Sequence, residues 1–398
     1  MPRKITFENG SLNVPDDPFI PFIEGDGVGP ELWRAAGPVL LAAAEKTGRA
    51  ISFVPAEAGA KAFERTGAYL PPETLVMLES HRVSIKGPLA TPVGGGIRSL
   101  NVAIRQALDL YACVRPVSFV PGVPSPVKAP EKVDMIVFRE NTEDLYAGIE
   151  WPSGSPEAES LREFLNARLG TRIAKGAALG VKPMTEAASK RLVRMAVRWA
   201  LKEGRPSVTL VHKGNIMKYT EGAFRKWGYE VAAEEFGDRT VPEAEAAPAE
   251  RKVIVKDRIA DNMFMQILLR PAEYSVLAMP NLNGDYLSDA LAAQTGGLGM
   301  APGANIGDGV AVFEATHGTA PKYEGKDVAN PSSLILSGAL MLDHLGWRDA
   351  GDLVRSALRQ AVADGLMTND LARQIPGAKA CGTAAFGKAV LERVRRDG

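Results

Sequence analysis

The sequence predicts an α/β protein with a largely parallel sheet. Short apolar runs typical of strands alternate with longer segments in which apolar residues recur every three or four positions, as in amphipathic helices. The 40 glycines and 28 prolines fall between these segments rather than in one tract, which is typical of many short connections. We therefore expect strands and helices to alternate, and we allow for antiparallel strands later in the chain.

The strands are predicted from short apolar runs bounded by polar or turn-forming residues. In chain order these runs are 19–23, 83–86, 114–120, 133–138, 208–212, 252–255, 274–279 and 310–314. Helical patterns lie between several of them, and the clearest is 185–202, which reads TEAASKRLVRMAVRWALK. We interpret 296–309 as a flexible glycine-rich segment and 237–250, which is polar and rich in proline and alanine, as a solvent loop.

Residues 146–182 do not follow the alternation of strand and helix. Strand-like pieces flank WPSGSPEAES, a short amphipathic helix and TRIAKGAALGVKP. We interpret this segment as an arm that leaves its domain to pair with a second subunit. A long surface excursion within one subunit is the alternative.

Composition and charge exclude several classes of protein. The chain has 398 residues, of which 45% are hydrophobic and 24% charged, as in globular proteins with two or three lobes. Its 47 basic and 47 acidic residues balance, which argues against nucleic acid or an anionic membrane as the main partner. Two cysteines cannot build a disulfide framework, and no apolar stretch resembles a signal or a membrane span, so we expect a cytoplasmic protein.

The glycine-rich loop at 23–30 does not match the Rossmann motif for nucleotide binding. The loop follows a predicted strand and opens a helix, as a Rossmann fingerprint does, but Pro30 stands where the third glycine belongs. The acidic residue about 20 positions further on, Glu45, lies within a helical run. A Walker A motif, a zinc-protease motif and a serine-hydrolase elbow are absent from the sequence as well.

Four arginines in or beside apolar segments indicate a site for a small polyanion. They are Arg98, Arg105, Arg115 and Arg139. Arg98 and Arg105 are seven residues apart, so two helical turns would place them on one side. Arginine binds carboxylates in a bidentate manner, and Ser99 and Asn101 at the same helix start could donate to an anion. Ordinary surface ion pairs are the alternative.

Two pairs of aspartates indicate a divalent cation. Asp257 and Asp261 are separated by four residues, as are Asp285 and Asp289. At helical spacing their like charges repel unless a cation lies between them, and oxygen ligands suit Mg²⁺ or Mn²⁺ better than zinc. Solvated helix faces or N-caps are the alternative.

Two further groups of residues follow predicted strands and indicate catalytic or binding roles there. Lys213 follows an apolar strand, where α/β active sites collect, and desolvation could make it a base, with Tyr146 as a proton donor. The loop His317-Gly318-Thr319-Ala320 also follows a strand. Its backbone N–H groups could hold a phosphate, to which Lys322 would add charge. Structural roles are the alternative for each group taken alone.

Together these segments resemble the bacterial NADP-dependent branch of the isocitrate/isopropylmalate dehydrogenase family. The similarity extends from about Pro18 to the C-terminus. It rests on the blocks GPLATPVGGGIRSLNVAIRQALDLYACVRPV, FRENTEDLYAGIEW, VTLVHKGNIMKYTEGAF, LLRPAEY, NLNGDYLSDALAAQTGGLGMAPGANIGD and FEATHGTAPKYEGKDVANP.

The resemblance implies a fold that binds a dinucleotide without a Rossmann motif. A large discontinuous domain would comprise 1–110 and 296–398 and carry most of the cofactor site. A small domain would comprise 111–145 and 183–295 and carry the metal site and the dimer interface, with 146–182 as a clasp arm. The resemblance also implies a homodimer with shared active sites.

The implied activity is the oxidative decarboxylation of isocitrate to 2-oxoglutarate with NADP⁺ and Mg²⁺ or Mn²⁺, a step of the tricarboxylic acid cycle. Tyr146 and Lys213 would be catalytic, with Lys213 given to the partner's site. The implied binding residues are Ser99, Asn101, Arg105, Arg115 and Arg139 for isocitrate; Asp285, Asp289 and the partner's Asp261 for the metal; and Thr91, Asn215, His317, Gly318, Thr319, Ala320, Lys322, Tyr323, Asn330, Arg373 and the partner's Arg270 for the cofactor. Asp257 would have no such role.

Among the departures from the family pattern, one concerns the 2′-phosphate of the cofactor, and two alternative functions stay open. Asn369 stands where the family has a tyrosine that reaches the 2′-phosphate, so we expect an NADP preference with weaker discrimination against NAD. A 3-isopropylmalate dehydrogenase would need an apolar wall, whereas Ser99 and Asn101 suit a carboxylate; its NAD preference would also conflict with Lys322. A non-catalytic metal–tricarboxylate binding protein would have no need of Tyr146 or Lys213.

Overall fold

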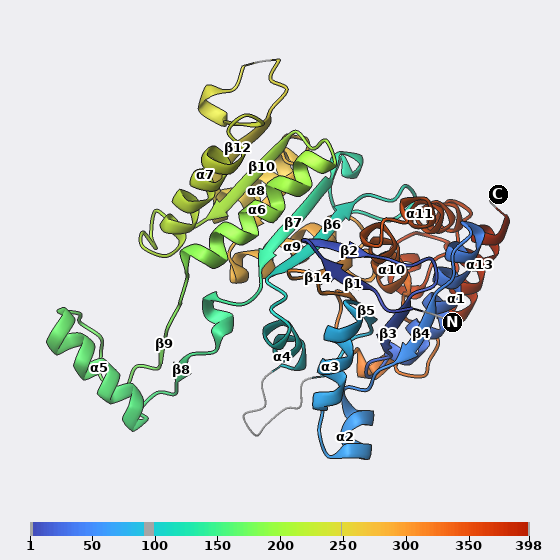
Figure 1. The fold of residues 1–398 in the computed structure, drawn as a ribbon, viewed down its shortest axis with the longest axis horizontal. Coiled ribbons are helices and arrows are strands. Elements are labelled where there is room, and N and C mark those ends of the chain that lie inside the picture. Colours follow the sequence, from blue (N-terminus) through green and yellow to red (C-terminus); the bar gives the residue numbers. More distant parts are fainter. Residues whose placement is uncertain (1–2, 91–98, 248, 397–398) are drawn as a thin grey trace.

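The computed structural model describes residues 3–90, 99–247 and 249–396, and it confirms the α/β prediction. A single sheet of 11 strands crosses the molecule (Figure 1). Its order is β11 (Thr240–Pro242), β12 (Val253–Ile259), β10 (Ser207–His212), β13 (Val276–Met279), β7 (Asp134–Glu140), β6 (Ala112–Ser118), β14 (Pro302–Ile306), β15 (Ala311–Ala315), β5 (Val83–Lys86), β3 (Phe19–Ile23) and β4 (Ser52–Pro55).

The sheet has two parallel halves joined by antiparallel strands. The five strands from β11 to β7 are parallel to one another, as are the four from β15 to β4. Between the halves, β6 pairs antiparallel with both β7 and β14, and β14 pairs antiparallel with β15. The expectation of antiparallel strands beside a largely parallel core is therefore confirmed.

Helices cover both faces of the half that contains β7. Along β7, Ile136 and Phe138 belong to the core formed with α6 (Glu186–Lys202) and α7 (Glu221–Phe236). Met135 and Val137 belong to the core formed with α8 (Ala260–Leu269) and α9 (Asn281–Gln294). Because side chains alternate along a strand, the next residue on the face of Val137 is Arg139, which therefore points toward α9.

Four other helices pack against one another beside β14 and β15, and this cluster is seen at the right of Figure 1. They are α1 (Gly29–Lys46), α10 (Ser332–His344), α11 (Arg348–Ala363) and α13 (Thr383–Arg396). The smaller elements are β1 (Thr6–Glu8), β2 (Ser11–Asn13), α2 (Ala60–Thr66), α3 (Pro72–His81), α4 (Leu100–Ala107) and α12 (Asn369–Ala372). Within the described parts of the chain, every helix is too short or too polar to cross a membrane.

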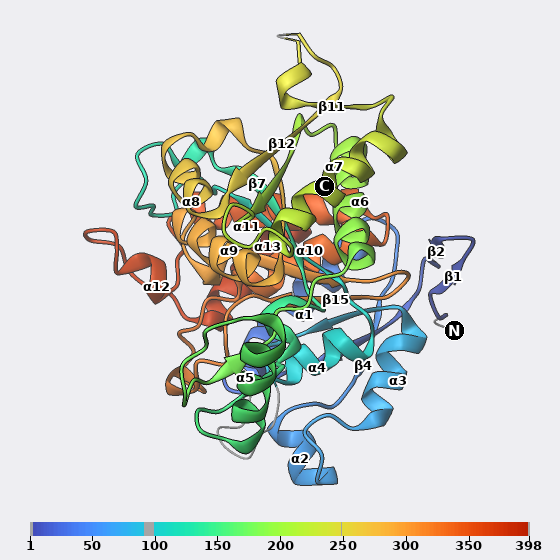
Figure 2. The same cartoon turned by 90° about the vertical axis from the view of Figure 1, so that its left-hand side faces the viewer.

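The segment 146–182 projects from the body of the molecule (Figure 1), so that α5 lies in front of the body in Figure 2. Two extended strands, β8 (Glu150–Trp151) and β9 (Leu179–Gly180), pair antiparallel and lead to α5 (Pro156–Leu169). Ser155 caps α5 by accepting a hydrogen bond from the backbone N–H of Ala158. On α5, Phe164 and Leu169 are 56% and 65% exposed, which is unusual for large apolar side chains on a well-formed helix.

The eight predicted strands are all present, but two predictions about other segments are wrong and a third is right only in part. The supposed flexible segment 296–309 contains β14, a central strand. Its sequence PGANI has small residues because space is limited: a Cβ on Gly303 would lie 3.0 Å from the Thr316 side chain. The supposed loop 237–250 contains β11, and Asp257 lies on β12 while Asp261 lies on α8, so these two aspartates do not share a helix face.

Candidate active site

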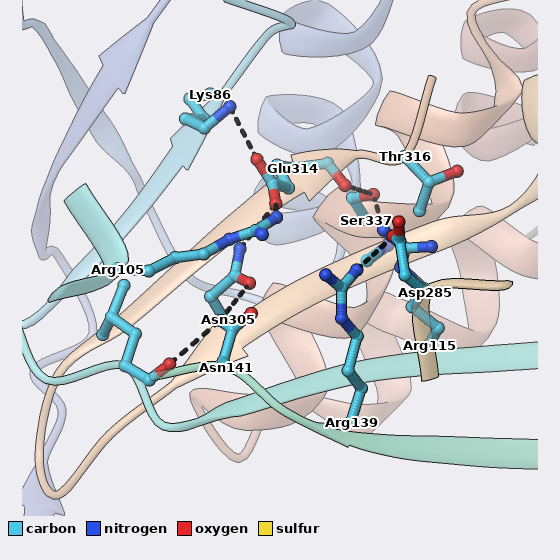
Figure 3. Close-up of polar contacts among 12 residues, drawn as sticks. Lys86, Arg105, Arg115, Arg139, Asn141, Asp285, Asn305, Glu314, Thr316 and Ser337 are labelled. Carbon is cyan, nitrogen blue, oxygen red and sulfur yellow. Dashed lines mark hydrogen bonds and ion pairs between the residues drawn. The ribbon is translucent and has the colours of Figure 1, made fainter. Parts of the chain in front are cut away.

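Two buried arginines lie side by side on the central strands (Figure 3). Cys113 on β6 is the register partner of Arg139 on β7, and Arg115 is two residues from Cys113, so both arginines project from the same face. Arg139 Nε donates to Asn281 Oδ1 at 2.8 Å, and Arg115 Nη1 donates to Ser288 Oγ at 2.6 Å. The guanidinium groups are thereby fixed toward α9.

Helix α9 brings two aspartates to these arginines. It begins directly after β13, and Asp285 and Asp289 follow one turn apart. Asp285 forms an ion pair with Arg139, and Asp289 Oδ1 lies 2.9 Å from Arg115 Nη1. The close approach of α9 to β7 depends on Gly284, because a Cβ there would lie 2.6 Å from Arg139 Cβ.

Tyr146 completes this group from the base of the projecting segment. Its hydroxyl donates to Asp285 Oδ2 at 2.5 Å, and its ring centre lies 4.7 Å from the guanidinium carbon of Arg139. Burial and the hydrogen bond to Asp285 raise the pKa of Tyr146. The phenol therefore keeps its proton at neutral pH and can donate it.

The two aspartates differ in their electrostatics. Burial raises the pKa of Asp289, and the nearby charge of Asp285 adds to this against the attraction of Arg115. Burial also acts on Asp285, but the charge of Arg139 and the hydrogen bond from Tyr146 outweigh it and lower the pKa. Two carboxylates one helical turn apart fit a hard divalent cation, which takes oxygen ligands and stabilises their charged forms.

Lys213 and Asp261 form a separate group. Lys213 follows β10, and its ammonium forms an ion pair with Asp261 at the start of α8, where the side chain of Asp261 is 70% exposed. The hydrogen bond from Lys213 lowers the pKa of Asp261. Among the described residues, no three acidic, histidine or cysteine side chains lie close enough to hold a metal, so Asp261 does not join Asp285 and Asp289 within one chain.

Helix α4 carries the remaining predicted substrate residues. Ser99 is its N-cap, and Arg105 Nη2 donates to Glu314 Oε1 at 2.9 Å. Asn101 Oδ1 and Arg105 Nε are buried and find no hydrogen-bond partner within the ranges that the structure describes. Thr91 and Arg98 lie outside the described residues. Buried polar atoms of this kind need a partner: a bound anion could accept from Arg105 Nε, whereas Asn101 Oδ1 needs a donor such as a water or a hydroxyl group.

The predicted cofactor residues gather around a cavity of about 420 Å³ beside α1 and α12. His317, Gly318, Ala320, Tyr323, Asn330 and Arg373 line it, together with Asn369 and Asp370. Thr319 lies at its edge, where its carbonyl accepts a hydrogen bond of 3.0 Å from the Val28 N–H of the glycine-rich loop. Burial lowers the pKa of His317, so the ring is neutral at physiological pH.

Besides Thr319, three described residues of the predicted cofactor site lie outside the lining of this cavity. The Lys322 ammonium lies 4.8 Å from the ring centre of Tyr323. Asn215 is exposed on the loop that follows Lys213, and Arg270 is the C-cap of α8. Asn215 and Arg270 thus belong to the same part of the fold as Lys213 and Asp261.

This geometry agrees with a comparison of the chain with known families. The sequence model described as "Isocitrate/isopropylmalate dehydrogenase" matches residues 19–390, nearly the whole chain. The chain belongs to the isocitrate/isopropylmalate dehydrogenase family.

Individual relatives within the family are similar over their full length. "Isocitrate dehydrogenase [NADP]" of Archaeoglobus fulgidus is 56% identical, covering 99% of this chain and 97% of the relative. The protein of the same name from Staphylococcus epidermidis is 50% identical, covering 99% of each chain. The crystal structure of isocitrate dehydrogenase from Methylococcus capsulatus superposes with a TM-score of 0.80 at 40% identity, covering 95% of this chain and 99% of that one.

The expected fold class is confirmed by this membership. The isocitrate/isopropylmalate dehydrogenase family has an α/β fold with a large mixed sheet and no Rossmann arrangement. The glycine-rich loop at 23–30 is therefore not a dinucleotide fingerprint. In this family member it has a packing role, because a Cβ on Gly27 would lie 2.2 Å from the Thr319 carbonyl oxygen.

A buried ion cluster lies beside the arginines of this dehydrogenase and was not predicted from the sequence (Figure 3). Lys86 at the end of β5 pairs with Glu314 on β15, with Nζ and Oε2 2.6 Å apart and side-chain exposures of 3% and 9%. Asn305 Nδ2 also donates to Glu314 at 2.6 Å. Burial acts to raise the pKa of Glu314, but Lys86 and Arg105 outweigh it and lower the pKa. The missed signal was a charged residue ending each of two apolar strands.

Proposed function

We propose that the protein catalyses the NADP⁺-dependent oxidative decarboxylation of isocitrate to 2-oxoglutarate and CO₂. The observation that carries the proposal is the contact of two buried arginines with Asp285 and Asp289 beside the protonated phenol of Tyr146. Relatives named isocitrate dehydrogenase [NADP], at 50–56% identity over nearly their full length, support it.

The proposed substrate site consists of Ser99, Asn101, Arg105, Arg115 and Arg139. Isocitrate has three carboxylates, and arginines bind carboxylates through paired N–H donors. Arg115 and Arg139 are already charged and oriented by α9, so little reorganisation is needed when an anion binds. The buried Arg105 Nε can donate to a substrate carboxylate, and the buried Asn101 Oδ1 can accept from the substrate hydroxyl.

The proposed metal site consists of Asp285 and Asp289 with Asp261 of the partner subunit. The donor set is all carboxylate, which suits Mg²⁺ or Mn²⁺. When bound, the ion would supply Lewis-acid polarisation of the substrate oxygens. The ion pairs of Asp285 and Asp289 with arginines keep both carboxylates in place at the site.

Two side chains of this family member would move protons. We assign to Lys213, serving the partner's site, removal of the hydroxyl proton during oxidation. Tyr146 would return a proton to the carbon from which CO₂ has left, which agrees with its raised pKa.

The proposed cofactor site is the cavity between α1 and α12. His317, Gly318, Thr319, Ala320 and Asn330 would hold the adenosine part. Lys322, Tyr323, Arg373 and Arg270 of the partner subunit would bind the 2′-phosphate, and Thr91 and Asn215 would face the nicotinamide. When bound, NADP⁺ supplies the hydride acceptor.

The proposed assembly is a homodimer. Large apolar side chains stay exposed on α8 and α9, namely Met265 (47%), Leu268 (54%), Leu269 (67%) and Tyr286 (59%). Such a patch is typical of an interface between subunits. A second copy on this surface, with segment 146–182 as the clasp, would bring Lys213 and Asp261 to the partner. The division into a large domain (1–110 and 296–398) and a small domain (111–145 and 183–295) is part of the same proposal.

The experiment that tests the function follows the reduced-nicotinamide absorbance band with isocitrate, NADP⁺ and Mg²⁺. A folded dimer that gives no signal would contradict the proposal. Isopropylmalate with NAD⁺, measured in parallel, tests the rival dehydrogenase. A protein that binds isocitrate and Mg²⁺ by calorimetry but forms no reduced nicotinamide would be a non-catalytic binding protein.

Replacing Gly284 by alanine tests the close contact of α9 with β7. We expect a loss of about 1–3 kcal/mol in the free energy of unfolding, because the new Cβ overlaps Arg139. Because α9 must move, the KM for isocitrate should rise by about tenfold. Denaturant unfolding and saturation kinetics measure both effects. Gly37→Ala in α1 is the control, since its Cβ would make only ordinary contacts, and equal results for both variants would contradict the assignment.

Replacing Asn369 by tyrosine tests the 2′-phosphate site. Asn369 lines the cofactor cavity beside Arg373. A phenol that reaches the phosphate adds one hydrogen bond to a charged group, worth about 1.5–3 kcal/mol. We expect the ratio of kcat/KM for NADP⁺ over NAD⁺ to rise by about tenfold or more. Asn369→Phe is the matched control, and an equal rise for both variants would contradict a hydrogen bond to the phosphate.

A further inference from the structure

Lys182, at the base of the projecting segment, lies in a buried ion cluster with two carboxylates. Its ammonium is 2.5 Å from Asp144 Oδ1 and 2.9 Å from Glu221 Oε1. The side chains of Lys182, Asp144 and Glu221 are only 15%, 2% and 1% exposed. Burial acts against the charge of Lys182, but its two partners outweigh this and raise the pKa. Lys182 therefore keeps its positive charge at neutral pH.

Asp144 connects this cluster to the segment that carries Tyr146. Its backbone is in the left-handed region with φ of 68°, which is costly for a residue other than glycine and needs support from its surroundings. The Asp144 carboxylate accepts hydrogen bonds from the N–H groups of Leu145 at 2.7 Å and Leu282 at 2.9 Å. Leu282 is in the first turn of α9, so Asp144 holds Tyr146 against the helix that carries Asp285.

Glu221 connects the same cluster to Lys213. It is the first residue of α7, and its Oε2 accepts the backbone N–H of Lys213 at 2.5 Å. The same oxygen accepts Asn283 Nδ2 of α9 at 2.8 Å. The position of the Lys213 backbone therefore depends on a carboxylate whose other oxygen is held by Lys182.

We propose that Lys182 is a positioning residue that links the two active sites of the dimer. Within one subunit it ties Tyr146, which serves that subunit's own site, to Lys213, which serves the partner's site. This inference rests on the proposed function with shared sites and goes beyond it, because it assigns a role to a residue that contacts neither substrate nor cofactor. Loss of the ammonium would leave two buried carboxylates to repel each other and would displace both segments.

Mixed dimers separate the two effects of Lys182. One subunit carries Tyr146→Phe, so the single working site combines Tyr146 of the unmodified subunit with Lys213 of the modified one. Lys182→Met is then placed in either subunit. In the Tyr146→Phe subunit it acts only through Lys213, and in the other subunit it acts only through Tyr146. We expect kcat to fall by about tenfold or more in both arrangements, since small misplacements of catalytic groups are costly.

Control variants distinguish linkage from loss of folding. The double variant Lys182→Met with Glu221→Gln keeps the net charge of the cluster. It replaces Lys182→Met in the experiment if that single variant does not fold. Lys182→Arg should restore kcat at least in part, because it keeps the charge. Lys190→Met is the matched control, since Lys190 also joins two carboxylates, Glu186 and Glu230, but away from the site; it should leave kcat unchanged.

The outcomes are distinct. A fall in kcat in only one arrangement, or an equal fall with Lys190→Met, would overturn the link between the sites even though the unsubstituted dimer is active. An unsubstituted dimer that is inactive with isocitrate and NADP⁺ would contradict the proposed function, and this inference would fall with it. A fall in both arrangements, with rescue by Lys182→Arg, supports the link.

Discussion

Replacing Asp285 by asparagine is expected to lower kcat/KM for isocitrate by about a thousandfold. Asp285 contacts both Arg139 and Tyr146 and is a proposed metal ligand. Losing its charge removes several kcal/mol of transition-state stabilisation, and about 4 kcal/mol corresponds to a thousandfold in rate. Steady-state kinetics at several Mg²⁺ concentrations measure the effect, and the Mg²⁺ concentration for half-maximal rate should rise.

The matched control is Asp343→Asn. Asp343 on α10 also pairs with an arginine, Arg355 of α11, and the two atoms Nη1 and Oδ2 are 2.8 Å apart. Its loss should affect the free energy of unfolding without changing the response to Mg²⁺. If Asp285→Asn lowered the rate but left the Mg²⁺ dependence unchanged, its assignment as a metal ligand would be wrong.

Mixing two inactive dimers is expected to restore activity. Lys213→Met and Tyr146→Phe homodimers should each lose about 10²–10⁴-fold in kcat, because each lacks one proton-transfer group in both sites. In a mixed dimer with one subunit of each kind, one site has both defects and the other has none. Activity per mixed dimer should therefore return to about half that of the unsubstituted protein, as two equivalent sites of a symmetric dimer require.

This result depends on exchange of subunits between the two variants. Tagged subunits purified in two steps give the mixed dimer, and the two unmixed variants under the same conditions are the control. A mixed dimer as inactive as either parent would show that Lys213 and Tyr146 act in the same subunit's site. The exposed ion pair of Lys213 with Asp261, apart from the aspartates of α9, is the reason we expect restoration.

The elements of the sheet could be predicted because most strands are apolar runs of ordinary composition. β14 was missed, since PGANI has small and polar residues with low strand propensity, and Gly303 among them has little space beside Thr316. Asp257 and Asp261 share helical spacing, yet a strand ends between them at Ile259. Spacing alone does not locate such a boundary, because two residues four positions apart can lie on one helix or on either side of a strand end.

The candidate site, like the sheet, could be predicted only in part. Arg115 and Arg139 could be identified because an arginine within an apolar strand is costly unless it is paired. Lys86 and Glu314 obey the same rule and could have been found by applying it to every strand. The cluster of Lys182, Asp144 and Glu221 could not be, since its members are far apart in the sequence and only the fold brings them together.

The two edges of the sheet have a consequence for how the protein behaves at high concentration. A sheet of 11 strands would be prone to add strands from neighbouring molecules if its edges were long and flat. Here β11 has three residues and β4 has four, and each ends in proline, Pro242 and Pro55. Proline has no N–H to offer a new strand, so the short edge strands and their prolines disfavour strand-by-strand aggregation at both edges.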